Sequence, residues 1–75
     1  MMQITLRAAR VNSGYTLKEA AEKFGISPDT LSKYEKDSTN VPRTFFIKIE
    51  KVYNVSVENI FFGQQSDFFR ILNSA

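Results

Sequence analysis

The sequence predicts an all-α fold, a compact domain of five short helices followed by a short C-terminal extension, on three observations. Apolar residues recur three and four positions apart along most of the chain, which is the period of a helix. The three glycines and two prolines stand where helices can begin or end. Nothing in the sequence reads as two alternating strands joined by a two-residue turn. A chain of 75 residues can form one such domain but not two.

The first two helices are delimited by residues that favour helix ends. The first is expected over about residues 4–12, with Gly14 just past its end. Thr16 is a good N-cap for the second helix, and Gly25 supplies the left-handed residue that ends it. The apolar residues of the second helix follow helical spacing: Leu17, Ala20, Ala21 and Phe24.

The third helix is expected over residues 27–36 and shows mostly polar side chains. Ser27 is its N-cap, and Pro28 in the first turn loses no hydrogen bond because that position has no intrahelical partner. Its apolar stripe consists of Leu31 and Tyr34 alone. A helix that buries so little contributes little to a small core, so its open side is available to bind something else.

The fourth helix is expected between Pro42 and Tyr53, and Asn54 is a suitable left-handed stop. Its apolar spacing turns one side of the helix toward the core. The residues expected to face inward are Phe46, Ile49, Val52 and Tyr53.

A short fifth helix and a final turn complete the prediction. Ser56 caps the fifth helix, and Gly63 closes it. The apolar residues of this helix are Val57, Ile60 and Phe61. The last turn is expected over 67–72, after Ser66 as its cap.

Composition argues against several functions. The chain has no cysteine and no histidine, so it has no disulfide, no thiolate metal site and no histidine base. We therefore expect no enzyme activity, no metal and no cofactor. Neither a basic leader nor a run of about 18 apolar residues occurs, so a cytoplasmic protein with no membrane contact is expected. The net charge of +2 is a weak sign of an acidic partner.

The second and third expected helices have the anatomy of a helix-turn-helix. Ala20, Ala21 and Gly25 are small where two helices cross closely. Leu31 and Tyr34 anchor the second helix of the pair and leave its other side free. In this motif the second helix enters the major groove of DNA.

The stretch "YTLKEAAEKFGISPDTLSKYEK", followed by "KIEKVYNVSVENIF", resembles the lambda-repressor-like, Cro/repressor-type helix-turn-helix domains. The resemblance covers roughly residues 4–63. It implies a DNA-binding domain over 1–63, a recognition helix over 27–36 and a homodimer on a two-fold double-stranded operator. Residues 64–75 then form a C-terminal extension, a short helix or a dimer contact.

The resemblance also assigns DNA contacts. The expected base contacts are Lys33, Thr30, Asp29 and Pro28. Lys33 is the best candidate for direct readout, since lysine or arginine to guanine is the commonest specific contact. Asp29 either accepts from a cytosine amino group, repels wrong sequences, or is a helix N-terminal acid favoured by the dipole. Pro28 offers only apolar contact, where relatives often have a long polar side chain.

The expected contacts to the DNA backbone are Ser27, Lys18, Lys36, Asn40, Arg43 and Thr44. Most of them lie in or after the loop that leaves the recognition helix, and Lys18 lies at the start of the second helix, a favourable place for an anion. Arg10 and Glu35 resemble a structural ion pair that in several relatives joins the first helix to the recognition helix.

The aromatic extension leaves two interpretations open. Phe62, Phe68, Phe69 and Leu72 either fold back over the fourth and fifth helices or form a dimer interface. Two functions follow. The first is a sequence-specific transcriptional regulator of phage or bacterial type, with no small-molecule ligand because no ligand domain fits in the remaining residues. The second is an antirepressor or antitoxin-like protein-interaction module that uses the aromatic surface.

Overall fold

The computed structural model describes residues 3–73 of the chain, and within them it confirms the all-α fold class. The elements are β1 Ile4–Thr5, α1 Leu6–Asn12, α2 Leu17–Phe24, α3 Pro28–Lys36, α4 Arg43–Tyr53, a 3₁₀ turn Val57–Asn59, β2 Ile60–Phe61 and α5 Gln65–Asn73. Residues 1–2 and 74–75, at the ends of the expected domain and extension, lie outside the described residues. No helix in residues 3–73 has the length and apolar character needed to cross a membrane.

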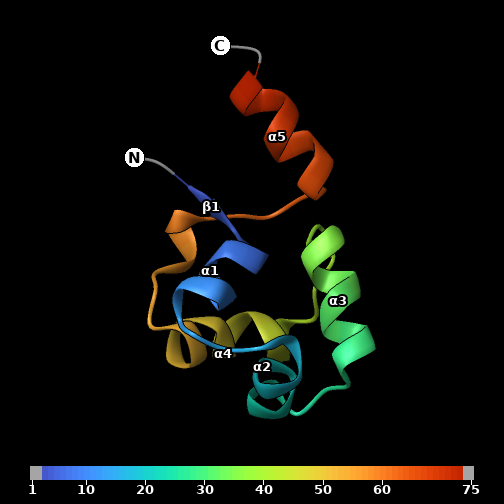
Figure 1. Ribbon diagram of the computed structural model, residues 1–75, viewed down its shortest axis with the longest axis vertical. Helices are drawn as coiled ribbons and strands as arrows, with labels where there is room; N and C mark the ends of the chain where they lie inside the picture. Colours follow the sequence, from blue (N-terminus) through green and yellow to red (C-terminus); the bar gives the residue numbers. More distant parts are fainter. Residues whose placement is uncertain (1–2, 74–75) are drawn as a thin grey trace.

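Helices α1 to α4 enclose one core, and α5 extends from it. In Figure 1, α1, α2, α3 and α4 lie together in the body of the molecule, whereas α5, in red, points away beside the N-terminal strand. The molecule is accordingly elongated, with extents of 37 × 22 × 22 Å. The buried apolar core comprises Leu6, Ala9, Ala20, Ala21, Phe24, Leu31, Phe45, Ile49, Tyr53 and Ile60.

The chain begins with a short strand where a helix was expected. Ile4 and Thr5 pair in parallel with Ile60 and Phe61, so α1 starts at Leu6. The Thr5 hydroxyl then caps α1 by accepting from the amide of Ala8 at 3.0 Å. The expected start at residue 4 is wrong by two residues because a partner strand 56 positions away occupies that segment.

The turn between α2 and α3 follows the prediction. Gly25 has a φ of 74°, the left-handed conformation that ends α2 at low cost. Ala20 and Ala21 are fully buried. Because these side chains are so small, α2 and α3 approach closely, and this pair makes the most extensive helix contact in the described chain.

Helix α4 buries Ile49 and Tyr53 as expected, and Val52 packs partly buried against the core, but Phe45 takes the inward place expected for Phe46. Phe45, Ile49 and Tyr53 are buried, at a regular spacing of four residues. Phe46, expected in the core, is 38% exposed. It lies one residue and about 100° beyond Phe45, so it faces sideways and packs against the Phe62 ring at 5.3 Å. Asn54 ends the helix in the left-handed conformation, as predicted.

The expected fifth helix over 56–63 does not form. The chain makes one 3₁₀ turn, Val57–Asn59, and then enters β2. The Ser56 side chain makes no cap, and the Val57 amide instead donates to the Glu50 carboxylate at 2.9 Å. Ile60 is buried as a strand residue, which suits its β-branched side chain. The fifth α-helix is α5, which begins at Gln65, two residues before the expected final turn.

Candidate nucleic-acid interface

Helix α3 is attached to the domain along one narrow side. Leu31 is fully buried, and the half-buried Tyr34 ring lies 4.8 Å from the ring of Phe45. Glu35, one position on, is buried as well. These three side chains hold α3 against the core and leave the opposite side uncovered.

The uncovered side carries the predicted contact residues. Asp29, Lys33 and Lys36 are spaced by four and three positions, so they share one face of the helix, and all three are exposed. Pro28 at the start of α3 is also exposed. Within the described part of the chain neither lysine forms an ion pair, so both ammonium groups are available to an anion.

The first turn of α3 is closed by two hydroxyl groups. Ser27 caps the helix by accepting from the amide of Thr30 at 3.2 Å. The Ser27 and Thr30 hydroxyls lie 2.8 Å apart, and Thr30 is only partly exposed. One of the two hydroxyl protons is therefore used inside the protein. Ser27 acts as a helix cap, and the Thr30 hydroxyl has limited capacity for a further polar contact.

The segment after α3 brings further predicted residues to the surface. Asn40, Arg43 and Thr44 are exposed, while Val41 between them packs against the core and anchors the loop. Arg43 is the first residue of α4, where unpaired backbone N–H groups favour an anion.

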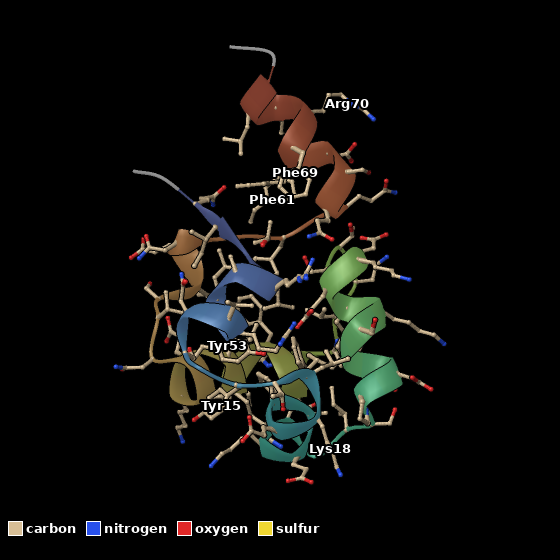
Figure 2. The ribbon with its side chains drawn as sticks, in the orientation of Figure 1. Tyr15, Lys18, Tyr53, Phe61, Phe69 and Arg70 are labelled. Carbon is tan, nitrogen blue, oxygen red and sulfur yellow. The ribbon has the colours of Figure 1, made fainter. Side chains whose placement is uncertain are left out.

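The start of α2 differs from the expected anion site. Thr16 and Glu19 form a capping box: the Thr16 amide donates to Glu19 Oε1 at 2.9 Å, and the Glu19 amide donates to the Thr16 hydroxyl at 3.1 Å. Hydrogen bonding to the Glu19 carboxylate, first from the Thr16 backbone amide and then from the Thr16 side chain, holds the pKa of Glu19 below its usual value. A carboxylate of the protein thus already occupies part of this helix end. Lys18, the second residue of α2, is exposed and lies at the lower end of the molecule in Figure 2.

Sequence reasoning did not single out Arg7, which lies beside α3. A groove of 210 Å³ is lined by Arg7, Arg10, Leu17, Ser32, Glu35, Lys36 and Gln65. Arg7 is exposed and shares this groove with Lys36. The sequence spacing could have predicted this place for Arg7. It precedes Arg10 by three positions and so lies on the side of α1 that faces α3.

The Arg10–Glu35 pair joins α1 to α3. Arg10 Nε donates to Glu35 Oε2 at 2.7 Å and Nη2 donates to Oε1 at 3.3 Å, so the contact is bidentate. Nη1 donates to the carbonyl of Tyr15 at 3.0 Å. The two side chains are 12% and 7% exposed. This pair fixes the orientation of α3 and is not itself free to contact a ligand.

A buried phenol lies close to this pair. Tyr53 is 5% exposed, and its hydroxyl has no hydrogen-bond partner among the residues that the structure describes. Burial raises the pKa of the Tyr53 phenol well above its usual value, and the negative charge of Glu35 raises it further. Tyr53 is therefore a neutral core residue, with its ring 5.3 Å from Phe24.

The four apolar residues expected at a dimer contact fall in two places. Phe62 packs with Phe46 beside α4. Phe68, Phe69 and Leu72 instead line an open groove of 480 Å³ between α5 and the β1–α1 segment. Figure 2 shows Phe61 and Phe69 between β1 and α5, whereas Arg70 extends away from the domain. Phe69 and Leu72 are 49% and 53% exposed, so the side chains that the structure describes leave the groove open.

Comparison with known proteins agrees with this geometry. Residues 6–60 match the helix-turn-helix family model. The chain is 43% identical over 53 residues to the HTH-type transcriptional regulator ImmR of Bacillus subtilis (strain 168), a match that covers 71% of this chain and 42% of that protein. It is 32% identical over 60 residues to an uncharacterized HTH-type transcriptional regulator of Archaeoglobus fulgidus, covering 80% of this chain and 86% of the relative.

The chain therefore spans less than half the length of ImmR but most of the archaeal relative. The matched residues include α2, the left-handed turn at Gly25 and α3. On the matches and the geometry together, the chain belongs to the lambda-repressor-like helix-turn-helix family.

Proposed function

We propose that the protein is a sequence-specific DNA-binding transcriptional regulator that inserts α3 into the major groove. One observation carries the proposal: α3 is held by Leu31, Tyr34 and Glu35, and its opposite side is exposed and bears two lysines that form no ion pair within residues 3–73. An α-helix fits the major groove, and its N-terminal half then faces the base edges.

Within this proposal the residues have separate roles. Lys33 contacts guanine O6 or N7, and Asp29 accepts from a cytosine amino group or repels other bases. Thr30 and Pro28 add contacts at the start of the helix. The phosphates are contacted by Ser27, Lys18, Lys36, Asn40, Arg43 and Thr44. In a phage or bacterial cell such a regulator acts in the cytoplasm, where the DNA is.

We further propose that it binds as a Cro-like or repressor-like homodimer. Phe69 and Leu72 are half exposed on a nine-residue helix that is too short to be stable without packing. A second copy supplies a matching apolar face, since a two-fold contact pairs a surface with itself. Two copies then place their recognition helices about 34 Å apart on one face of the DNA.

The exposed apolar face of α5 supports a second candidate function. The same surface, with Val11 of α1 also 57% exposed, suits a protein-interaction module of the antirepressor or antitoxin type. In that case α5 holds another protein and α3 has no DNA partner.

A titration against random duplex DNA at low and moderate salt separates the two functions. A DNA-binding regulator gives an affinity that falls with salt, with a slope of about −0.9 in log–log form per phosphate contacted. The control is Lys51→Ala, which removes an exposed cation from the last turn of α4 and should leave the affinity unchanged. Absence of salt-dependent binding at micromolar protein would sink the regulator and favour the interaction module.

A further inference from the structure

The loop that leaves α3 is fastened to the segment that enters α5. The Ser38 amide donates to the Gly63 carbonyl at 2.9 Å, and the Gly63 amide donates to the Ser38 hydroxyl at 3.0 Å. That hydroxyl also donates to the Gly63 carbonyl at 3.3 Å. Ser38 is 3% exposed, so these bonds are shielded from water. We name this set of hydrogen bonds between Ser38 and Gly63 the clasp.

The residues beside the clasp continue it in both directions. Asp37 and Gln64 form an antiparallel bridge, so two consecutive residues on each side are paired. The Asp37 carboxylate also accepts from the amide and the hydroxyl of Thr39, at 3.0 and 2.5 Å. The chain is therefore fixed up to the residue that precedes Asn40, which is exposed.

Gly63 is suited to its place in the clasp. A Cβ atom at this position would lie 2.9 Å from the Phe61 ring. That ring packs against Phe68 of α5 at 5.2 Å, so a larger residue would have to displace a packed side chain. The glycine that sequence analysis assigned to the end of a helix thus serves this contact.

We propose that Ser38 and Gly63 are positioning residues that hold the loop over 39–42, and with it the start of α4 at Arg43 and Thr44, in the conformation that contacts the DNA backbone. The inference rests on the proposed DNA-binding function. A loop of this length without regular structure loses conformational entropy when it binds. The clasp fixes its first residues before DNA arrives, and Val41 fixes its middle against the core. Asn40 and Arg43 are then presented to phosphates without a further ordering step.

The test compares Ser38→Ala with Ser13→Ala. The Ser13 hydroxyl also joins distant segments, donating to the carbonyls of Ala9 at 2.8 Å and Tyr53 at 3.1 Å, but it lies away from the loop. Affinity for duplex DNA is measured as a function of salt for each variant. Ser38→Ala should bind every duplex more weakly, and its salt slope should be smaller by about 0.9 for each phosphate that it no longer neutralises. Ser13→Ala should keep the slope of the unsubstituted chain.

A double-mutant cycle with Arg43→Ala makes the test specific. Arg43→Ala should make the salt dependence of binding less steep in the unsubstituted chain. In Ser38→Ala it should change the slope little, because the displaced loop no longer brings Arg43 to a phosphate. An unchanged slope in Ser38→Ala, or an equal effect of Arg43→Ala in both backgrounds, overturns the positioning role.

A folding control and the binding of the unsubstituted chain distinguish failure of the positioning role from failure of the proposed function. If circular dichroism shows that Ser38→Ala has lost its helices, Gly63→Ala, which disturbs the clasp from the other side, is held to the same criteria. If the unsubstituted chain binds no DNA, the proposed function fails and the positioning role with it. If the unsubstituted chain binds but the variants keep its slope, the positioning role alone is overturned.

Discussion

Two lysines on the outer side of α3 are expected to act differently although both are exposed. Lys33 lies in the middle of α3 and Lys36 lies at its end. In the proposed complex Lys33 reaches the base edges and Lys36 reaches the phosphates. Lys33→Ala should relax the preference at one base pair, by about 1–3 kcal/mol. Lys36→Ala should weaken binding to all sequences alike. Binding of both variants to a panel of single-base operator changes checks this, and equal losses on every sequence for both would contradict it.

Arg10, in the buried ion pair with Glu35, is expected to be important for stability. Arg10→Ala should destabilise the fold by about 3–5 kcal/mol, because it leaves the Glu35 carboxylate buried without its partner. The matched control is Arg70→Ala, which breaks an exposed pair with Asp67 at 3.3 Å and should cost less than about 0.5 kcal/mol. Urea unfolding measures both. Similar costs for the two variants would show that the buried pair has no special structural role.

Tyr53 gives a prediction with a pH dependence. The pKa of the Tyr53 phenol is higher in the folded protein than in the unfolded chain, so ionisation of this phenol disfavours the fold. The stability linked to the protonated form is therefore complete below the unfolded pKa of about 10 and is lost as the pH rises above that value. Tyr53→Phe removes the titrating group, so its free energy of unfolding should fall less steeply above about pH 10.

At neutral pH Tyr53→Phe should be neutral or stabilising, by up to about 1 kcal/mol, since it removes a buried hydroxyl that has no hydrogen-bond partner among the described residues. Tyr34→Phe, which removes a half-buried phenol from α3, is the control. A large loss of stability in Tyr53→Phe at neutral pH would mean that the hydroxyl makes a bond.

At the scale of elements, the caps decide where the helices of the motif begin. Ser27→Ala should destabilise the fold by about 0.5–2 kcal/mol, because the Thr30 amide loses its acceptor. Ser56→Ala, at the start of the 3₁₀ turn, should cost less since Ser56 makes no cap. Thermal unfolding of the two variants checks the difference, and an equal loss in both would contradict the cap assignment.

The elements also show what the sequence could and could not predict. The ends of α2 and α3 were predictable because Thr16, Gly25 and Ser27 act through their nearest neighbours. The pairing of β1 with β2 was not, since two residues carry no periodic signal and their partner lies far along the chain. Phe46 was mistaken for a core residue because Phe45 beside it is equally apolar, and only the position of α4 against Phe24 selects between them.

The exposed side of α3 could be predicted for the same local reason. That Lys33, Lys36 and Asp29 share the exposed side follows from the helical period of α3 once Leu31 and Tyr34 are taken as the buried side. Their assignment as DNA contacts rests on the family resemblance and stays a prediction. Three other features were not predicted. They are the capping box at Glu19, the groove beside Arg7 and the clasp between Ser38 and Gly63. The first is a local pattern that was overlooked, and the other two depend on how distant segments pack.

At the scale of the whole molecule, α5 extends from the core and leaves the apolar side chains of Phe69 and Leu72 half exposed. If it forms the dimer contact, Leu72→Asp should dissociate the dimer and abolish cooperative operator binding, because it places a charge in an apolar interface. Ile47→Asp, at a residue of α4 that is 59% exposed, is the control and should do neither. Light scattering at tens of micromolar reports the oligomer. A monomer in the unsubstituted chain, with non-cooperative binding, would reject the dimer.

The uncovered side of α3 is the feature on which the proposed function depends. Amide chemical shifts of the isotope-labelled protein, followed by NMR while duplex DNA selected for binding is added, report directly which surface the DNA meets. We predict the largest changes over residues 29–36 and at Asn40, Val41, Arg43 and Thr44, the residues of these segments that have an amide proton, with small changes along α5. Changes confined to α5, or no saturable change at any amide, would contradict the account.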